Sequence, residues 1–129
     1  MAHPNEELLR KGYEAFGSGD TQTLDQVLSD DIVWHVPGRS PIAGDYKGKE
    51  QVLQFFGQIV QMTGGAFKNE IHDLLANDEH GVVLVTATGD REGKRLDARQ
   101  VHVFHIQDGR ATEFWNHTDD LYAFDEFWS

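Results

Sequence analysis

The chain has 129 residues, with 22 acidic and 11 basic side chains and a formal net charge of −11. This length is that of one ordinary domain, residues 1–129, which can bury a core of its own. The negative charge argues against binding to nucleic acid or to an anionic membrane surface. No apolar run approaches the roughly 20 residues that span a bilayer. The sequence contains no cysteine, which excludes disulfides and thiolate metal sites. Together with an N-terminus that lacks a signal-peptide pattern, this predicts a cytoplasmic protein.

The N-terminal half predicts two short helices, a strand and a longer helix. Asn5 and Asp20 stand at the starts of the first two helices, where their side chains can cap free backbone N–H groups. Residues 32–36 are β-branched and aromatic and predict a strand. A loop without periodicity follows over residues 39–47, and an apolar stripe at helical spacing predicts a third helix over residues 48–63.

The C-terminal half predicts four strands that are joined by short turns. In the first of these strands, Phe67, Ile71 and Leu75 are separated by even numbers of positions, which would place them on one face. The second strand, residues 82–88, is mostly β-branched and apolar. The last two strands form a hairpin, because Asp-Gly at positions 108–109 is a strong turn signal between two β-rich runs.

The first strand of this hairpin, residues 95–106, places a histidine among apolar side chains. Alternation puts one set of its residues on a single inward face: Leu96, Ala98, Gln100, His102, Phe104 and Ile106. A neutral imidazole in such a place can take or give a proton near pH 7, because burial disfavours its charged form. The alternative is a core histidine that is tied to a backbone carbonyl or to a buried polar neighbour.

The aromatic tail, residues 119–129, predicts a terminal helix in preference to an extended arm. The order is then α-α-β-α-β-β-β-β before this tail. Short joints between the last four strands require antiparallel pairing. A strongly curved sheet with helices on its concave side would enclose a pocket, so the sequence predicts an α+β fold.

Three stretches of sequence are distinctive: residues 34–38 (WHVPG), residues 44–48 (GDYKG) with Phe55 and Phe56, and residues 103–115 (VFHIQDGRATEFW). With the order of elements above, these stretches resemble the SnoaL-like branch of the nuclear transport factor 2-like superfamily, which includes ketosteroid isomerases, limonene epoxide hydrolase and polyketide cyclases. The resemblance implies a cone-shaped, curved antiparallel sheet that is closed by three helices. It also implies a homodimer through the outer sheet face and a dry pocket for a small apolar molecule.

The resemblance transfers only in part to individual residues. Ketosteroid isomerases use a carboxylate base at the end of the first strand, a tyrosine in the first helix and a protonated acid on a later strand. The corresponding positions here hold His35, Tyr13 and His102, so two acids are replaced by histidines. Polyketide cyclases use an acid/base residue near the last strands. The polar candidates in that area are Asn116, His117 and Asp120.

The resulting hypothesis is a cofactor-independent acid/base enzyme, which removes a proton next to the carbonyl of an apolar compound and stabilises the enolate. The catalytic candidates are His102, His35, Tyr13 and Asp120. The candidates for ligand binding are Trp34, Phe55, Ile59, Phe104, Phe114 and Asn116. No metal site is predicted, because the histidines form neither a His-x-His strand pair nor a helical His-x₃-His pair. The alternative function is a non-catalytic module that binds a small apolar ligand or dimerises.

Overall fold

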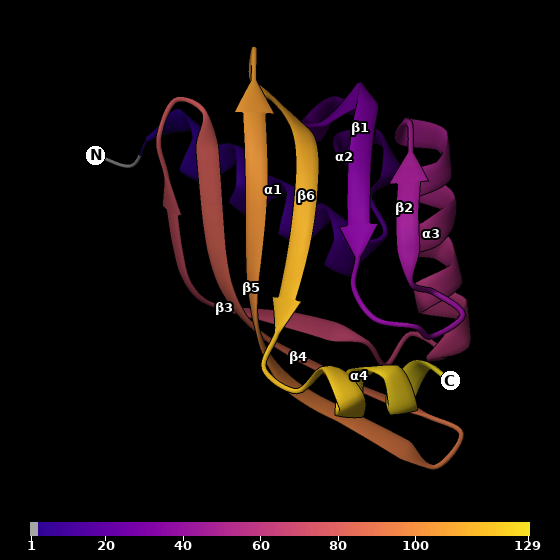
Figure 1. Cartoon of the computed structure of the whole chain (residues 1–129). Helices are drawn as coiled ribbons and strands as arrows, with labels where there is room; N and C mark the ends of the chain where they lie inside the picture. Colours follow the sequence, from indigo (N-terminus) through magenta and orange to yellow (C-terminus); the bar gives the residue numbers. More distant parts are fainter. Residues whose placement is uncertain (1–2) are drawn as a thin grey trace.

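A computed structural model describes residues 3–129 as a curved, six-stranded sheet with helices packed against one side (Figure 1). The elements in chain order are α1 (Pro4–Ser18), α2 (Thr21–Val27), β1 (Leu28–Val36), β2 (Gly44–Lys47), α3 (Lys49–Met62), β3 (Lys68–Ala76), β4 (His80–Arg91), β5 (Lys94–Gln107), β6 (Arg110–Thr118) and α4 (Leu121–Trp128). The predicted α+β fold, with helices that cover a curved sheet, is confirmed.

The sheet is mixed rather than wholly antiparallel. Its strand order is β2-β1-β6-β5-β4-β3, and every neighbouring pair is antiparallel except β1 and β6, which run parallel. The edge strand β2 lies in the stretch that was predicted as a loop. With only four residues it carries no alternating pattern, and it is held by pairing with the end of β1.

A bulge in β3 changes which of its side chains enter the core. Leu74 is 3% exposed, whereas Leu75, predicted on the same face as Phe67 and Ile71, is 55% exposed. The register against β4 shifts between Ile71 and Asp73. One extra residue in a strand inverts the alternation beyond it, so the parity read from the first part of β3 does not hold at its end.

The helix predicted in the aromatic tail is present as α4, which closes one end of the fold. Asp120 caps it by accepting a hydrogen bond from the backbone N–H of Ala123, and the helix buries Phe124, Phe127 and Trp128. The Arg91 guanidinium donates to the carbonyl oxygens of Phe127 and Ser129. The last turn of α4 is therefore fixed to the β4–β5 hairpin, and Figure 1 shows α4 beyond the end of β6, beside this hairpin.

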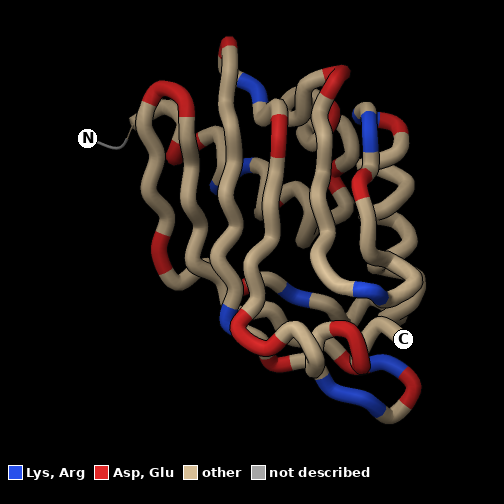
Figure 2. The backbone as a smooth tube through the Cα atoms, viewed as in Figure 1, with Lys and Arg blue, Asp and Glu red and all other residues tan. Residues whose placement is uncertain are grey.

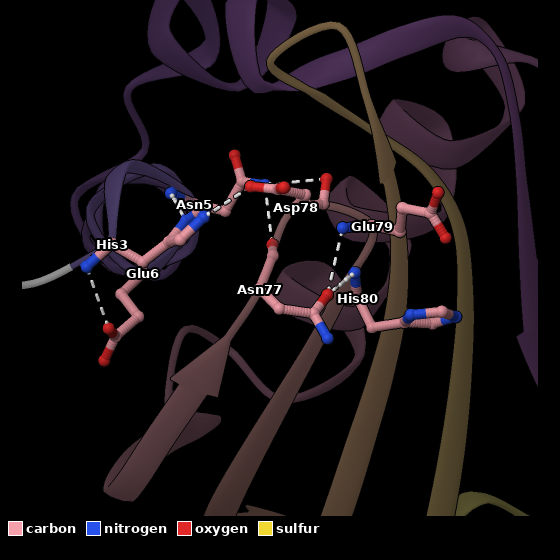
Figure 3. A network of polar contacts seen from close by, with 7 residues as sticks. All are labelled: His3, Asn5, Glu6, Asn77, Asp78, Glu79 and His80. Atoms are coloured by element: carbon pink, nitrogen blue, oxygen red, sulfur yellow. Dashed lines mark hydrogen bonds and ion pairs between the residues drawn. The ribbon is translucent and has the colours of Figure 1, made fainter.

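Several clusters of charged residues lie at turns and strand ends. Figure 2 shows acidic segments at several of the turns, and basic residues together with acidic ones at the tip of the β4–β5 hairpin. Figure 3 shows how the start of α1 is tied to the β3–β4 turn: the Asn5 amide donates to the carbonyl oxygens of Asn77 and Asp78, and His3 contacts the Asp78 carboxylate. None of the helices within residues 3–129 has both the length and the apolar character needed to cross a membrane.

Candidate functional site

The concave side of the sheet and the helices enclose a cavity of about 110 Å³. Its walls come mainly from α1, α3, β1, β5 and β6. Many of the residues predicted for the site line it: Tyr13, Trp34, Phe55, Ile59, His102, Phe104, Phe114 and Asn116. The cavity is smaller than the roughly 150 Å³ apolar cavity that takes up benzene in another protein, so as it stands it excludes multi-ring molecules and offers room for at most one small ring.

A chain of hydrogen bonds crosses this otherwise apolar cavity. The Nδ1 atom of His102 lies 2.5 Å from the Tyr13 hydroxyl, and its Nε2 atom lies 2.9 Å from the Gln100 side-chain oxygen. Because an amide oxygen only accepts, Nε2 carries the proton and donates to Gln100. Nδ1 is then unprotonated and accepts a hydrogen bond from the Tyr13 O–H. Gln100 in turn donates to the Thr118 hydroxyl at 3.5 Å.

Burial keeps the two titratable residues of this hydrogen-bond network, His102 and Tyr13, uncharged. Burial lowers the pKa of His102 from 6.5 to about 3, and the nearby charge of His117 adds a smaller contribution in the same direction. Burial also raises the pKa of the Tyr13 phenol well above 10.0. At neutral pH the site therefore holds a neutral imidazole against a protonated phenol. The remaining polar groups of the lining are the amides of Asn69, Gln100 and Asn116 and the indole N–H groups of Trp34 and Trp128.

Aromatic rings form the apolar walls on either side of the hydrogen-bonded chain. Trp34 stacks on Phe114, with ring centroids 3.7 Å apart and planes at 13°. The edge of Phe56 meets Trp34 at 4.9 Å, and Phe114 meets the His102 ring at 5.0 Å. These contacts join β1, α3, β5 and β6, and they hold the imidazole in a fixed orientation. A flat, neutral ligand is the kind of molecule that such walls accommodate.

His35, a predicted catalytic candidate, lies on the opposite face of the sheet. Strand alternation separates it from Trp34, which points into the cavity. Its Nδ1 is 2.7 Å from the Asp45 carboxylate and its Nε2 is 2.7 Å from the Glu113 carboxylate. Partial burial lowers the pKa of His35, but the bonds to Glu113 and Asp45 outweigh this effect and hold it above 6.5. The ring also stacks on Trp115. The homodimer expected through this outer face stays a prediction.

Asp120, the other acid among the predicted catalytic residues, is exposed and caps α4, with its carboxylate 3.0 Å from the Ala123 N–H. The chain turns away from the sheet after β6, so Asp120 does not line the cavity. His117 is exposed and does not line it either, because strand alternation places its side chain opposite to that of Asn116. Of the four catalytic candidates, the structure brings only Tyr13 and His102 together. Within the described part of the chain, no three His, Asp or Glu side chains are grouped so that they could hold a metal ion.

The pattern of the SnoaL-like domain family matches residues 9–114, most of the chain and most of the cavity lining. The chain belongs to this family. An uncharacterized protein of Mycobacterium tuberculosis is 29% identical over 124 residues, which is 95% of each chain. Bal32a, from a soil-derived mobile gene cassette, is 43% identical with a TM-score of 0.95, and the match covers 99% of this chain and 98% of Bal32a. IdmH of Streptomyces antibioticus, provisionally described as a polyketide cyclase, is 21% identical with a TM-score of 0.73 over 91% of this chain and 92% of its own, and it supports the fold alone.

Two polar residues of this SnoaL-like site were given no role in the sequence prediction. Gln100 shares the inward parity of His102, so the signal was present: a polar side chain on an apolar face. Asn69 lies in the first part of β3, before the bulge, and it shares the parity of Phe67 and Ile71, so the same signal was present there. Both line the cavity.

Proposed function

We propose that this SnoaL-like domain is a cofactor-independent acid/base enzyme that acts on a compact, apolar carbonyl compound. The observation that supports the proposal is the Tyr13–His102–Gln100 hydrogen-bonded chain inside an aromatic cavity. His102 is the only group of the lining with a basic nitrogen that is unprotonated at neutral pH, since the other polar groups there are amides, indole N–H groups and a phenol. Proton removal next to the carbonyl, followed by reprotonation elsewhere, is an isomerisation; attack by the enolate on a second carbonyl is a cyclisation.

In the proposed mechanism the substrate carbonyl replaces His102 as the acceptor of the Tyr13 O–H. This frees the lone pair of Nδ1, which lies beside the phenol oxygen and faces the carbon next to the carbonyl. Nδ1 takes the proton from that carbon, and the enolate oxygen keeps the hydrogen bond from Tyr13. Gln100 continues to accept from Nε2–H, which holds the ring in place and stabilises the imidazolium.

The low pKa of His102 sets a condition on this mechanism. Protonating the ring in the empty cavity costs about 5 kcal/mol, from a pKa of about 3 against the ordinary 6.5. An enolate about 4 Å away returns about 4 kcal/mol at an effective dielectric constant of about 20. The imidazolium therefore forms only together with the enolate. Solvent protonation does not consume the base above about pH 4, because the free ring stays neutral there.

The experiment is hydrogen–deuterium exchange at the carbons next to the carbonyl of cyclohexanone, followed by NMR in deuterium oxide. The wild type is expected to exchange these protons faster than buffer. His102→Gln removes the base but keeps a polar side chain, and we expect the enhancement to drop by at least about a hundredfold. Tyr13→Phe should reduce it by a similar factor. His72→Gln, at an exposed position of β3, is the matched control and should leave it unchanged. Equal exchange by wild type and His102→Gln would contradict the assignment.

Binding without turnover is the second candidate, and one observation favours it: both ring nitrogens of His102 are already occupied by Tyr13 and Gln100. A ligand that does not displace the Tyr13 O–H would then only fill the cavity. In that case cyclohexanone shifts the NMR signals of the His102 ring on titration, and no exchange above the buffer rate accompanies the shift.

A further inference from the structure

Two asparagines of the cavity lining have side-chain oxygens that are buried and make no hydrogen bond within residues 3–129. They are Asn69 Oδ1 on β3 and Asn116 Oδ1 on β6. Buried polar atoms in folded proteins are nearly always paired, and an unpaired one is costly. An amide oxygen only accepts, so each of these atoms is suited to an O–H or N–H group of a ligand in the cavity.

Asn116 stands beside the proposed reaction centre. It is the β6 residue directly opposite His102 in the β5–β6 register, and both side chains point into the cavity. Directly opposite residues of an antiparallel pair have Cβ atoms about 4.5–5.5 Å apart. A ligand whose carbonyl oxygen lies at the Tyr13 hydroxyl therefore brings the atoms on the adjoining carbons to the Asn116 carboxamide.

Asn69 also faces the concave side of the sheet, but on a distant strand. It pairs with Ala87 on β4, which in turn pairs with Ala98 on β5, and its own strand β3 is three strands away from β6. Three strand spacings are about 14 Å along the sheet. Along the sheet, Asn69 therefore lies farther from His102 than Asn116 does, and it provides a matched comparison: the same amide in the same cavity at a different position.

We infer that the substrate is a compact α-hydroxy ketone, a one-ring molecule whose hydroxyl group, on the carbon next to the carbonyl, donates to Asn116 Oδ1. This inference rests on the proposed function, because it places the carbonyl at Tyr13 and His102. Removal of the remaining proton from the hydroxyl-bearing carbon by His102 gives an enediolate. The hydroxyl proton then passes to the former carbonyl oxygen, and His102 returns the carbon-bound proton to the former carbonyl carbon, so that the carbonyl moves to the neighbouring position. The atoms balance without any other reactant.

The test compares the binding of α-hydroxycyclohexanone and α-methylcyclohexanone, in which a methyl group takes the place of the hydroxyl. Binding is followed by NMR titration of the His102 ring. The wild type is expected to bind the hydroxy ketone about tenfold more tightly, since only that ligand satisfies Asn116. This wild-type comparison requires no variant to fold. Equal affinities, or a preference for the methyl ketone, would overturn the inference.

Two variants then assign the preference to one residue. Asn116→Leu keeps the side-chain size but removes the acceptor, and the preference for the hydroxy ketone should disappear; Asn116→Ala repeats the test if the leucine variant does not fold. Asn69→Leu makes the identical change across the cavity and should retain the preference. If Asn69→Leu abolishes the preference and Asn116→Leu retains it, the assignment to Asn116 is wrong.

The outcomes separate this inference from the proposed function. Exchange of cyclohexanone protons that depends on His102, combined with equal binding of the two substituted ketones, overturns the inference and leaves the enzyme proposal intact. A clear preference for the hydroxy ketone without any proton exchange supports the hydrogen bond to Asn116 Oδ1 and contradicts the proposal that the protein is an enzyme. Failure of both ketones to bind overturns the inference.

Discussion

Replacing His102 with glutamine tests whether the buried imidazole stays neutral in the folded protein. Burial, with a smaller contribution from His117, lowers the pKa of His102 from 6.5 to about 3 in the fold, whereas the unfolded chain keeps the ordinary value. On acidification the unfolded state binds this proton first, so the contribution of His102 to stability is full above pH 6.5 and is lost as the pH falls toward 3. Between about pH 7.5 and about pH 5 the loss amounts to ~2 kcal/mol, a large part of a typical domain's stability.

The assay is urea unfolding over this pH range for the wild type, His102→Gln and the control His72→Gln. The carboxylates also titrate as the pH falls, but they do so in all three proteins, so the difference between wild type and His102→Gln isolates the imidazole. The wild type and the control should lose ~2 kcal/mol more than His102→Gln. Parallel curves for all three would mean that the ring of His102 is solvated or charged in the fold, and the reasoning about a neutral base would fail.

Three further predictions concern other parts of the molecule. The pKa of His35 is raised by its two carboxylate partners despite partial burial, so its stabilising contribution is complete below pH 6.5 and is lost as the pH rises above it; in urea unfolding the wild type should lose more stability between about pH 6 and about pH 9 than His35→Gln. Gly38→Ala should destabilise by about 1–3 kcal/mol in thermal unfolding, because φ is +94° and a Cβ there would lie 2.0 Å from the Asp125 carboxylate. Gly57→Ala, in the α3 interior with nothing within 4 Å of the new Cβ, should stabilise by about 0.5–1 kcal/mol, and a loss of stability would contradict the assigned helical environment.

Features that depend on local sequence were predictable, and those that depend on distant partners were not. The Asp108–Gly109 turn adopts the positive φ values that such a hairpin requires, 53° and 74°, and alternation along β5 correctly brought His102 inward. The parallel pairing of β1 with β6 leaves no signal in either strand. The four-residue strand β2 is defined by its partner rather than by its own residues.

The same distinction explains the outcome at the candidate site. Tyr13 and His102 come from α1 and β5, and helical and strand periodicity each point them inward. His35 was ambiguous, because β1 carries apolar residues on both faces and the sequence alone does not say which face the helices cover. Asp120 comes two positions after the end of β6, and only the turn into α4 shows that its carboxylate is used as a cap.

The stacking of Trp34 on Phe114 has a consequence for how the cavity comes into being during synthesis. These rings belong to the first and last strands of the chain, 80 positions apart, and they meet only where β1 and β6 align side by side. During synthesis on the ribosome, α1, α2 and α3 are made well before β6, which supplies Phe114, and α4 is made after it. Ligand uptake would therefore begin only after β6 emerges, and a bound small molecule would report completed folding rather than assist its early stages.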